Sequence, residues 1–199
     1  MTAFMNILMT SLIAIFVQNS IFERALGINV LLYASRKREH LLGFFAAITY
    51  TTTISAAIIW NFDRLFAENE YYSIFMPILY VAVVSVLYIV TLVLIWRFFP
   101  RLFRNIRKYV HLSVFNCSVI GALFLCSVQG ADIFTYIGYG FGTGIGFLLA
   151  AYLLYIAADR LNSPLVPAAF RGFPIMLVYV GILSLALYAF TGYITSAVQ

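Results

Sequence analysis

The residues most able to do chemistry lie inside an apolar stretch, Val114 to Cys126, with the sequence VFNCSVIGALFLC. Asn116, Cys117 and Ser118 stand together there, and polar groups in hydrocarbon are unfavourable unless other groups satisfy them. A cysteine in an apolar helix usually acts as a small hydrophobic residue, although its thiolate is also a soft metal ligand. Whether Cys117 packs as a hydrophobic residue or binds a metal depends on the helices and loops that position it.

The composition predicts an all-α integral membrane protein. Of 199 residues, 64% are hydrophobic and 10% are charged, with a mean hydropathy of +1.00, whereas charged residues reach about 25% in soluble domains. Backbone groups cannot stay unpaired in lipid, so apolar runs of about 20 residues indicate helices rather than barrel strands. The first residues, MTAFMNILMTSLIAIFV, lack a basic region and a cleavage motif, and are expected to be a retained span.

Six transmembrane helices are expected in a single domain, residues 1–199. The apolar runs are 3–34, 41–60, 74–96, 109–128, 133–157 and 174–198. The first run is too long for one straight span, and Gln18 to Arg24 interrupts it with polar and charged residues. The fourth run contains the smaller interruption at Asn116. Helices 1 and 4 are therefore expected to be broken near the membrane midplane.

Basic residues are concentrated in alternate loops, which predicts that both termini face outward across a bacterial plasma membrane. They are Arg36, Lys37 and Arg38 in the first loop, Arg97, Arg101, Arg104, Arg107 and Lys108 in the third, and Arg160 and Arg171 in the fifth. The second loop sets Arg64 against Asp63, Glu68 and Glu70, and the fourth, Gln129 to Asp132, has neither Lys nor Arg. The net charge of +5 follows this topology, so it does not indicate binding to nucleic acid.

The two interrupted spans each open a set of three helices, approximately 1–98 and 99–199. Because three is odd, two such halves enter the membrane from opposite sides as an inverted repeat, and interrupted helices in matching positions point to a functional site. The direct similarity is short, Asn19-Ser20-Ile21 against Asn116-Cys117-Ser118. The fold expected is thus two inverted three-helix repeats.

Other polar and small residues have packing as their favoured interpretation. In the fifth span, Gly138, Gly142 and Gly146 share one helix face, while Gly140 and Gly144 lie nearly opposite, so both faces can take close neighbours. The threonine-rich stretch from Thr49 to Ser55 is expected to bond to backbone carbonyls rather than to line an ion path. Glu23 and Arg24 are expected to pair with each other, with a partner subunit or at a water-lined edge. Asp159 and Arg160 are expected to cap a helix and anchor it at the cytoplasmic surface.

Taken in order and spacing, several elements resemble the RnfA subunits of the Rnf electron-transport complex and their counterparts, the NqrE subunits of the sodium-translocating NADH:quinone reductase. They are Arg97-Phe98-Phe99-Pro100, Asn116-Cys117, Tyr139-Gly140-Phe141-Gly142 with Gly144 and Gly146, Val166-Pro167 with Phe170-Arg171-Gly172, and the stretch from Gly181 to Gly192. The resemblance implies a subunit without a substrate pocket of its own, in a multi-subunit redox complex, beside a homologous subunit of opposite orientation.

The resemblance also implies a [2Fe-2S] cluster at the interface of those two subunits, each of which gives two cysteines from its broken helices. Cys117 matches the family cysteine that follows asparagine, and Asn116 is expected to hydrogen-bond around the cluster. The second family cysteine follows a Leu-Gly-x element, but here Leu26-Gly27-Ile28 is followed by Asn29. An asparagine amide is a poor substitute for a thiolate on iron.

Neither nearby alternative replaces the missing thiolate. Cys126 is nine positions from Cys117, which puts it on the opposite helix face and about 13 Å along the axis. His111 is expected at the level of the lipid headgroups. Three functions therefore stay open. The chain could be a subunit that holds part of a transmembrane electron relay, or a structural subunit without a cluster. The third is a small secondary transporter or channel, in which Glu23, Arg24 and the threonine-rich stretch would contact the substrate or ion at a midplane site.

Overall fold

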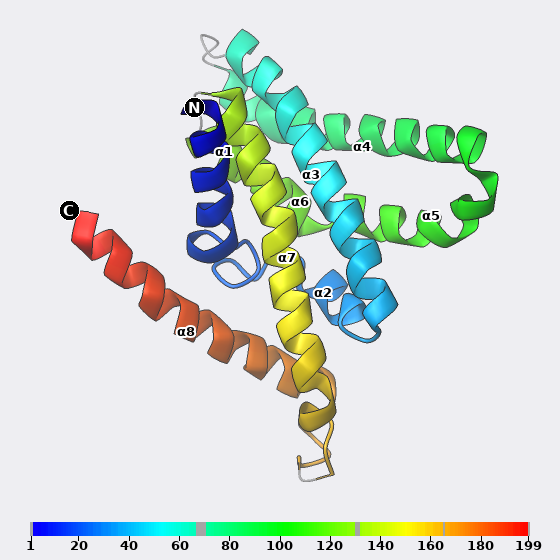
Figure 1. Ribbon diagram of the computed structural model, residues 1–199, viewed down its shortest axis with the longest axis vertical. Coiled ribbons are helices and arrows are strands. Elements are labelled where there is room, and N and C mark those ends of the chain that lie inside the picture. Colours follow the sequence, from blue (N-terminus) through cyan, green and yellow to red (C-terminus); the bar gives the residue numbers. More distant parts are fainter. Residues whose placement is uncertain (1, 67–70, 130–131, 165, 199) are drawn as a thin grey trace.

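The computed structural model describes residues 2–66, 71–129, 132–164 and 166–198, and every regular element in these ranges is a helix (Figure 1). The elements are α1 (Thr2–Leu12), a short π-helical segment η1 (Ile13–Val17), α2 (Ile28–Ala34), α3 (Arg38–Phe66), α4 (Tyr72–Phe98), α5 (Pro100–Val114), α6 (Cys117–Gln129), α7 (Ile133–Leu161) and α8 (Phe173–Val198). The prediction of an all-helical fold is confirmed for this part of the chain.

Several helices have the length and hydropathy of membrane spans. Within the described ranges, α3, α4 and α7 are each long and apolar enough to cross a bilayer. Ile106–Val114 and Cys117–Val128 pass the same test together and are bent by 51° at their break. The apolar helices Ala3–Val17 and Phe173–Tyr188 are shorter. The chain is therefore a polytopic membrane protein, while its number of spans stays a prediction.

The core forms where α7 packs between α1 and α3. Gly142 lies so close to α1 that a Cβ atom there would come within 2.6 Å of the Ser11 carbonyl oxygen, and one on Gly140 would come within 2.9 Å of the Thr52 carbonyl on α3. The Ser11 hydroxyl donates to the Gly138 carbonyl at 2.8 Å, and Thr52 donates to the Gly140 carbonyl at 2.7 Å. The two predicted glycine faces are confirmed.

Threonines on α3 bond to the backbone, as predicted. The hydroxyls of Thr49, Thr51 and Thr52 donate to carbonyls one turn earlier, at 2.7 to 2.8 Å. The hydroxyls of Thr53 and Ser55 are buried and have no hydrogen-bond partner among the described residues. Most hydroxyls of the threonine-rich stretch thus donate hydrogen bonds to carbonyls within α3 or on α7.

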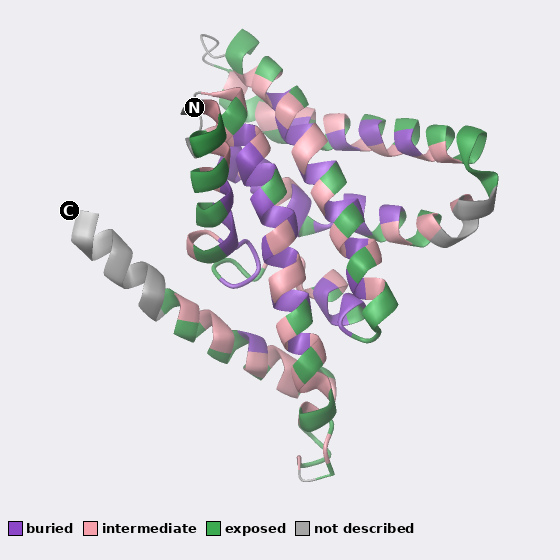
Figure 2. Cartoon of the chain, in the orientation of Figure 1, coloured by how far each residue is buried: buried purple, intermediate pink, exposed green. Residues whose placement is uncertain are grey.

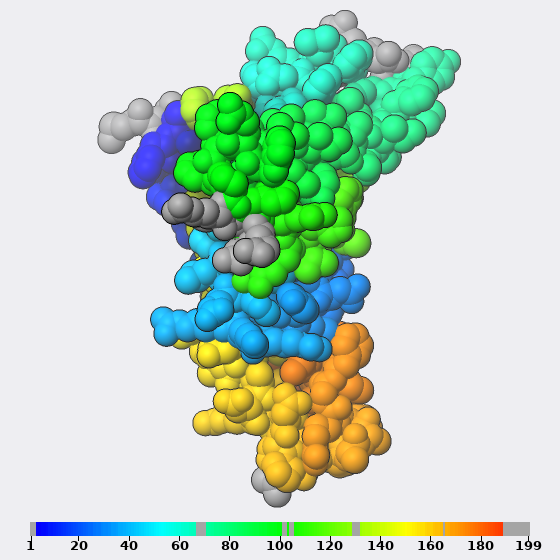
Figure 3. Space-filling view, turned by 90° about the vertical axis from the view of Figure 1, so that its right-hand side faces the viewer, coloured from blue at the N-terminus to red at the C-terminus, as the bar shows by residue number. Residues whose placement is uncertain are grey.

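The remaining long helices leave this core. Figure 1 shows α4 and α5 projecting to one side as a hairpin, and α8 leaning away on the other. Buried residues gather on α3 and α7 (Figure 2). In contrast, α1, α4 and α8 present large exposed apolar side chains such as Phe4, Ile89 and Leu185. The side view in Figure 3 shows the end of α7 and the start of α8 forming the lower end of the molecule.

Two boundaries differ from the sequence prediction. The second span was expected to end near residue 60, but α3 continues to Phe66, so Asp63 and Arg64 lie on a helix rather than in a loop. The fourth run was expected to begin near residue 109, but α5 begins at Pro100, which is well suited to a first helical position. Hydropathy misses both extensions because they are polar and helical at once.

The structure places one pair of charged residues near a helix end. Asp159 and Arg160 lie in the last turn of α7, and Asn162 follows as its C-cap, so the predicted capping role for Asp159 is wrong. Glu68 and Glu70 lie outside the described residues.

Candidate functional site

The first helix break runs from Gln18 to Gly27, between η1 and α2, where the sequence predicts it. Asn19 replaces the hydrogen bonds that the helix loses there. Its Oδ1 accepts the backbone N–H groups of Ile21 at 3.0 Å and Phe22 at 3.4 Å. Its Nδ2 donates to the carbonyls of Ile15 at 2.9 Å and Gly146 at 3.2 Å. The Asn19 side chain is therefore fully used inside this chain.

The break turns into α2 through two residues with positive φ, Ala25 at 56° and Gly27 at 79°. Such angles are unfavourable for a residue with a Cβ atom. At Gly27 space is also lacking, because a Cβ atom there would lie 2.5 Å from Asn116 Oδ1 and 2.9 Å from Ser118 Cβ. Glycine is thus required at position 27 for the two broken helices to approach each other.

The second break is much shorter and consists of Phe115 and Asn116, between α5 and α6. Asn116 Oδ1 accepts the backbone N–H of Ser118 at 3.2 Å, the same two-residue step that Asn19 makes to Ile21. Asn116 is only 3% exposed, and its Nδ2 has no hydrogen-bond partner among the described residues. A buried amide without a partner is unusual, because its desolvation is not compensated.

The two breaks meet, although they are almost a hundred positions apart. The hydroxyls of Ser20 and Ser118 lie 2.9 Å apart in a buried hydrogen bond. Leu26, from the first break, occupies the space beside Gly121 on α6. Together with the contact between Gly27 and Asn116, these interactions form the candidate functional site.

The predicted site residues divide into an inner pair and an outer pair. Gly27 and Asn116 form the inner pair and touch each other. Cys117 is the first residue of α6 and its side chain is exposed. Asn29 is the second residue of α2 and is also exposed. The cysteine and the asparagine that stands in for the family's second cysteine thus both lie at the surface, next to the junction of the breaks.

The other candidate ligands lie elsewhere. Cys126 is fully buried, with its Sγ 4.0 Å from the Tyr136 carbonyl oxygen, which agrees with the prediction that it does not join Cys117. His111 is exposed, and its Nδ1 is 2.9 Å from the Tyr88 hydroxyl. The described residues contain no group of three or more His, Cys, Asp or Glu side chains that could hold a metal. Cys117 is thus separate from the other candidate ligands.

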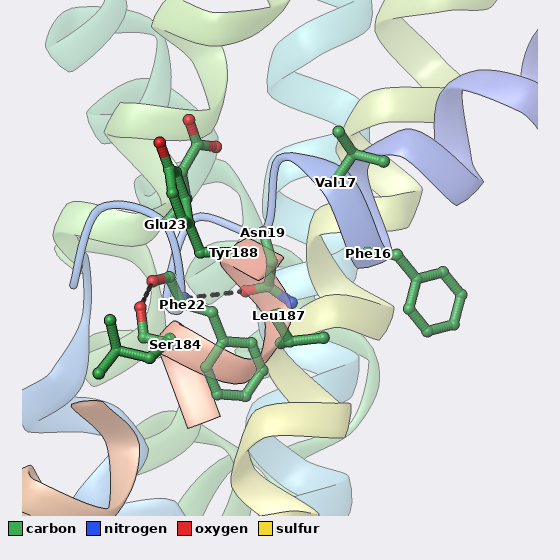
Figure 4. A pocket seen from close by; sticks show the side chains of 9 residues that line it. Phe16, Val17, Asn19, Phe22, Glu23, Ser184, Leu187 and Tyr188 are labelled. Atoms are coloured by element: carbon green, nitrogen blue, oxygen red, sulfur yellow. Dashed lines mark hydrogen bonds between the residues drawn. The ribbon is translucent and has the colours of Figure 1, made fainter. Parts of the chain in front are cut away.

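A small cavity of about 190 Å³ lies between the first break and α8. Its lining includes Asn19 and Phe22 from the break and Ser184 and Leu187 of α8, which lie close together in Figure 4. The Ser184 hydroxyl donates to the Phe22 carbonyl and joins α8 to the break. Glu23 also lines this cavity.

Glu23 forms an ion pair with Arg24, at 3.7 Å, with both side chains partly exposed. Of the three predicted arrangements, pairing of these two residues with each other is the one that this structure contains. An exposed pair of this kind contributes little to stability in water, but it lowers the unfavourable energy of leaving either charge alone within a membrane.

A second polar centre was missed by the sequence interpretation. The Asp63 carboxylate, near the end of α3, accepts hydrogen bonds from the hydroxyls of Tyr72, Tyr80 at 2.9 Å, and Tyr136 at 2.6 Å. Tyr80 and Tyr136 are buried. This group ties α3, α4 and α7 together at the end opposite to the first basic loop. Sequence spacing could not predict this group, because the tyrosine hydroxyls that donate to Asp63 come from two other helices.

The comparisons with known proteins agree with the resemblance seen in the sequence. A family described as "Rnf-Nqr subunit, membrane protein" matches residues 6–194. The RnfA subunit of the ion-translocating oxidoreductase complex of Alcanivorax borkumensis is 31% identical over 98% of this chain and 99% of that relative. The corresponding protein from Syntrophotalea carbinolica is 30% identical over 94% and 97%. The matching subunit of the Na(+)-translocating ferredoxin:NAD(+) oxidoreductase complex of Acetobacterium woodii is 27% identical over 94% and 98%. The chain therefore belongs to the Rnf-Nqr family of membrane subunits.

Proposed function

We propose that this chain is the RnfA-type membrane subunit of a redox-driven, ion-translocating oxidoreductase complex, and that it contributes to transmembrane electron transfer beside other subunits. The family match and the names of the relatives support this function. One observation on this chain carries it: two broken helices meet, and they place Cys117 at the surface beside the buried, unpaired amide of Asn116. Such a face is suited to contact with a second chain.

We further propose that the chain is built from two inverted halves, 1–98 and 99–199, and that a homologous subunit of opposite orientation packs against it. Three features support the repeat. Asn19 and Asn116 make the same hydrogen bond to the residue two positions later. Each half begins with a broken helix. The packing of α1 on α7 is matched by the packing of α5 on α3.

The side chains of this chain fit the implied [2Fe-2S] cluster only in part. The chain provides one exposed thiol, Cys117. At the second family position it offers Asn29, and its other cysteine, Cys126, is fully buried. One thiol does not fit a half-site of two thiolates, so we propose only that Cys117 contributes a ligand to a cluster completed by other donors.

The distribution of basic residues supports an orientation in a bacterial plasma membrane. Arg36, Lys37 and Arg38 flank α2 and α3, and a second basic group lies on α5. By the positive-inside rule these segments face the cytoplasm. We therefore propose that both termini lie on the outer side.

The decisive experiment uses the intact complex, purified anaerobically, with iron and acid-labile sulfide analysis and EPR spectroscopy. We expect Cys117→Ser to remove a [2Fe-2S] signal that the matched control Cys126→Ser retains. Asn29→Cys, which restores the missing family thiol, is expected to raise the iron content or sharpen the signal. If the complex assembles normally and neither the wild type nor Asn29→Cys holds a cluster that depends on Cys117, then ligation is wrong and the chain is a structural subunit.

A further inference from the structure

A groove of about 600 Å³ opens between α3 and α7, and none of its lining residues belongs to the junction of the helix breaks. The two helices are in close contact at Gly140 and Gly144, and they separate toward the start of α3 and the end of α7 (Figure 1). Helices that touch through glycines and cross at an angle leave a wedge beyond the contact. Within this groove, apolar side chains come from Leu42 on α3 and from Ile145 and Leu149 on α7.

The groove has one polar end, formed by Arg38, Tyr152 and Tyr155. Ile145, Leu149 and Tyr152 follow one another at helical spacing, so a continuous stripe of α7 leads from apolar side chains to these hydroxyls. On α3, Arg38 lies one turn before Leu42 and marks the same end. The groove therefore has the polarity of a membrane lipid, with an apolar length and one cationic end.

The polar groups at this end have no acidic partner in the described part of the chain. Among the described residues, the one ion pair joins Arg24 to Glu23, in the first break. The side chains of Arg38, Tyr152 and Tyr155 make no hydrogen bond to any described residue. Arg36 and Lys37 precede Arg38 in the same loop, while Glu39 and Asp159 are the nearby acids in the sequence. A guanidinium group of this kind is best satisfied by a phosphate or carboxylate, which it can hold through two parallel N–H groups.

We propose that this groove, called the Arg38 groove, binds one anionic phospholipid. The phosphate lies on the Arg38 guanidinium, and the hydroxyls of Tyr152 and Tyr155 donate to the phosphate or glycerol oxygens. One acyl chain follows Leu149 and Ile145 toward the glycine contact. In Figure 3 the start of α3 borders the end of α7 at the surface, so a lipid can reach the groove sideways from the membrane. Tyrosine rings and arginines are common at this depth of a bilayer, and anionic lipids are frequent in the cytoplasmic leaflet.

The favoured occupant is a lipid rather than a partner helix. A protein helix with its side chains is about 10–12 Å wide, whereas α7 and α3 are in close contact at Gly140 and Gly144 and leave no room for a helix between them there. A flexible acyl chain can fill such a wedge. In addition, an apolar helix offers no anionic partner for the Arg38 guanidinium at the open end, whereas a lipid phosphate does.

The test is a titration of the intact, detergent-purified and delipidated complex with phosphatidylglycerol, followed by mass spectrometry of the intact assembly. We expect Arg38→Gln to weaken the tightest phosphatidylglycerol site about tenfold, because a charge-assisted contact is lost. The matched control, Arg36→Gln, removes the same charge two residues away and is expected to leave that site unchanged. Phosphatidylcholine is expected to bind both variants and the wild type equally weakly.

Two further arms separate the sources of binding. Leu149→Trp fills the apolar part of the groove and is expected to remove the site, while Leu185→Trp, on the exposed face of α8, retains it. Inorganic phosphate at the same concentration is expected not to compete, because it lacks an acyl chain. Equal losses in Arg38→Gln and Arg36→Gln would show general surface attraction and overturn the proposal. A groove already covered by another polypeptide of the complex would give no site that depends on Arg38, with the same consequence.

Discussion

The two helix breaks differ in how an asparagine replaces the backbone hydrogen bonds that each interrupted helix loses. The first runs from Gln18 to Gly27, and Asn19 uses both ends of its amide for four hydrogen bonds within the chain. The second consists of Phe115 and Asn116, and Asn116 uses only its oxygen. Both breaks depend on a buried asparagine because an amide can replace both a lost backbone donor and a lost backbone acceptor.

The difference indicates which break is complete within the chain. Around Asn19 every polar atom of the side chain has a partner. Around Asn116 the Nδ2 group is buried without one among the described residues, and the next residue, Cys117, is exposed. A buried polar group without a partner is unfavourable, so the second break is less completely satisfied within the chain than the first. In the function proposed above, this second break, with the exposed Cys117, is the one that faces another subunit.

The contact between the breaks can be disrupted at Gly27, where we expect the largest effect. Gly27→Ala should lower the free energy of unfolding by about 3 kcal/mol, because it adds both an overpacked contact with Asn116 and an unfavourable positive φ. Gly172 is a matched control, since its φ is 91° but a Cβ atom there would meet nothing within 4 Å. We expect Gly172→Ala to cost about 1 kcal/mol. Denaturation in mixed detergent micelles measures both, and equal losses would mean that the breaks do not touch.

The unequal use of the two asparagines predicts an unequal loss on removal of their amides. Asn19→Ala should destabilise the isolated chain by about 2–3 kcal/mol, because several buried backbone groups lose their partner. Asn116→Ala should cost about 1 kcal/mol, since one hydrogen bond is lost. The same denaturation measurement compares them. A larger loss for Asn116→Ala in the isolated chain would contradict the view that its Nδ2 lacks a partner there.

The smallest expected effect concerns the hydrogen bond that joins the breaks, between Ser20 and Ser118. A double-mutant cycle with Ser20→Ala and Ser118→Ala should give a coupling energy of about 0.5–1.5 kcal/mol. Ser11 provides the control, because its hydroxyl bonds to Gly138 instead. The pair Ser11→Ala and Ser118→Ala is expected to be additive. Coupling in the control pair but not in Ser20 and Ser118 would remove this link between the breaks.

Much of the local structure could be predicted from the sequence. The polar residues Gln18 to Arg24 interrupt an apolar run, and the first helix ends there because Asn19 competes for its backbone bonds. The alternating glycines correctly predicted two contact faces on α7, because side-chain direction along a helix follows from spacing alone. The family resemblance was confirmed by the comparisons. Boundaries were less predictable, since α3 and α5 continue through polar residues that hydropathy assigns to loops.

The sequence by itself determined where helices form, where they break and which faces of α7 take close neighbours, because these depend on residues one or two turns apart. Only the tertiary structure decided which distant groups meet. Ser20 forms a hydrogen bond with Ser118, and Asp63 accepts hydrogen bonds from the hydroxyls of Tyr80 and Tyr136. These contacts form because helices that are far apart in the chain cross one another. The physical reason is that such contacts depend on helix crossing and tilt, which are set by packing across the whole molecule rather than by any local pattern.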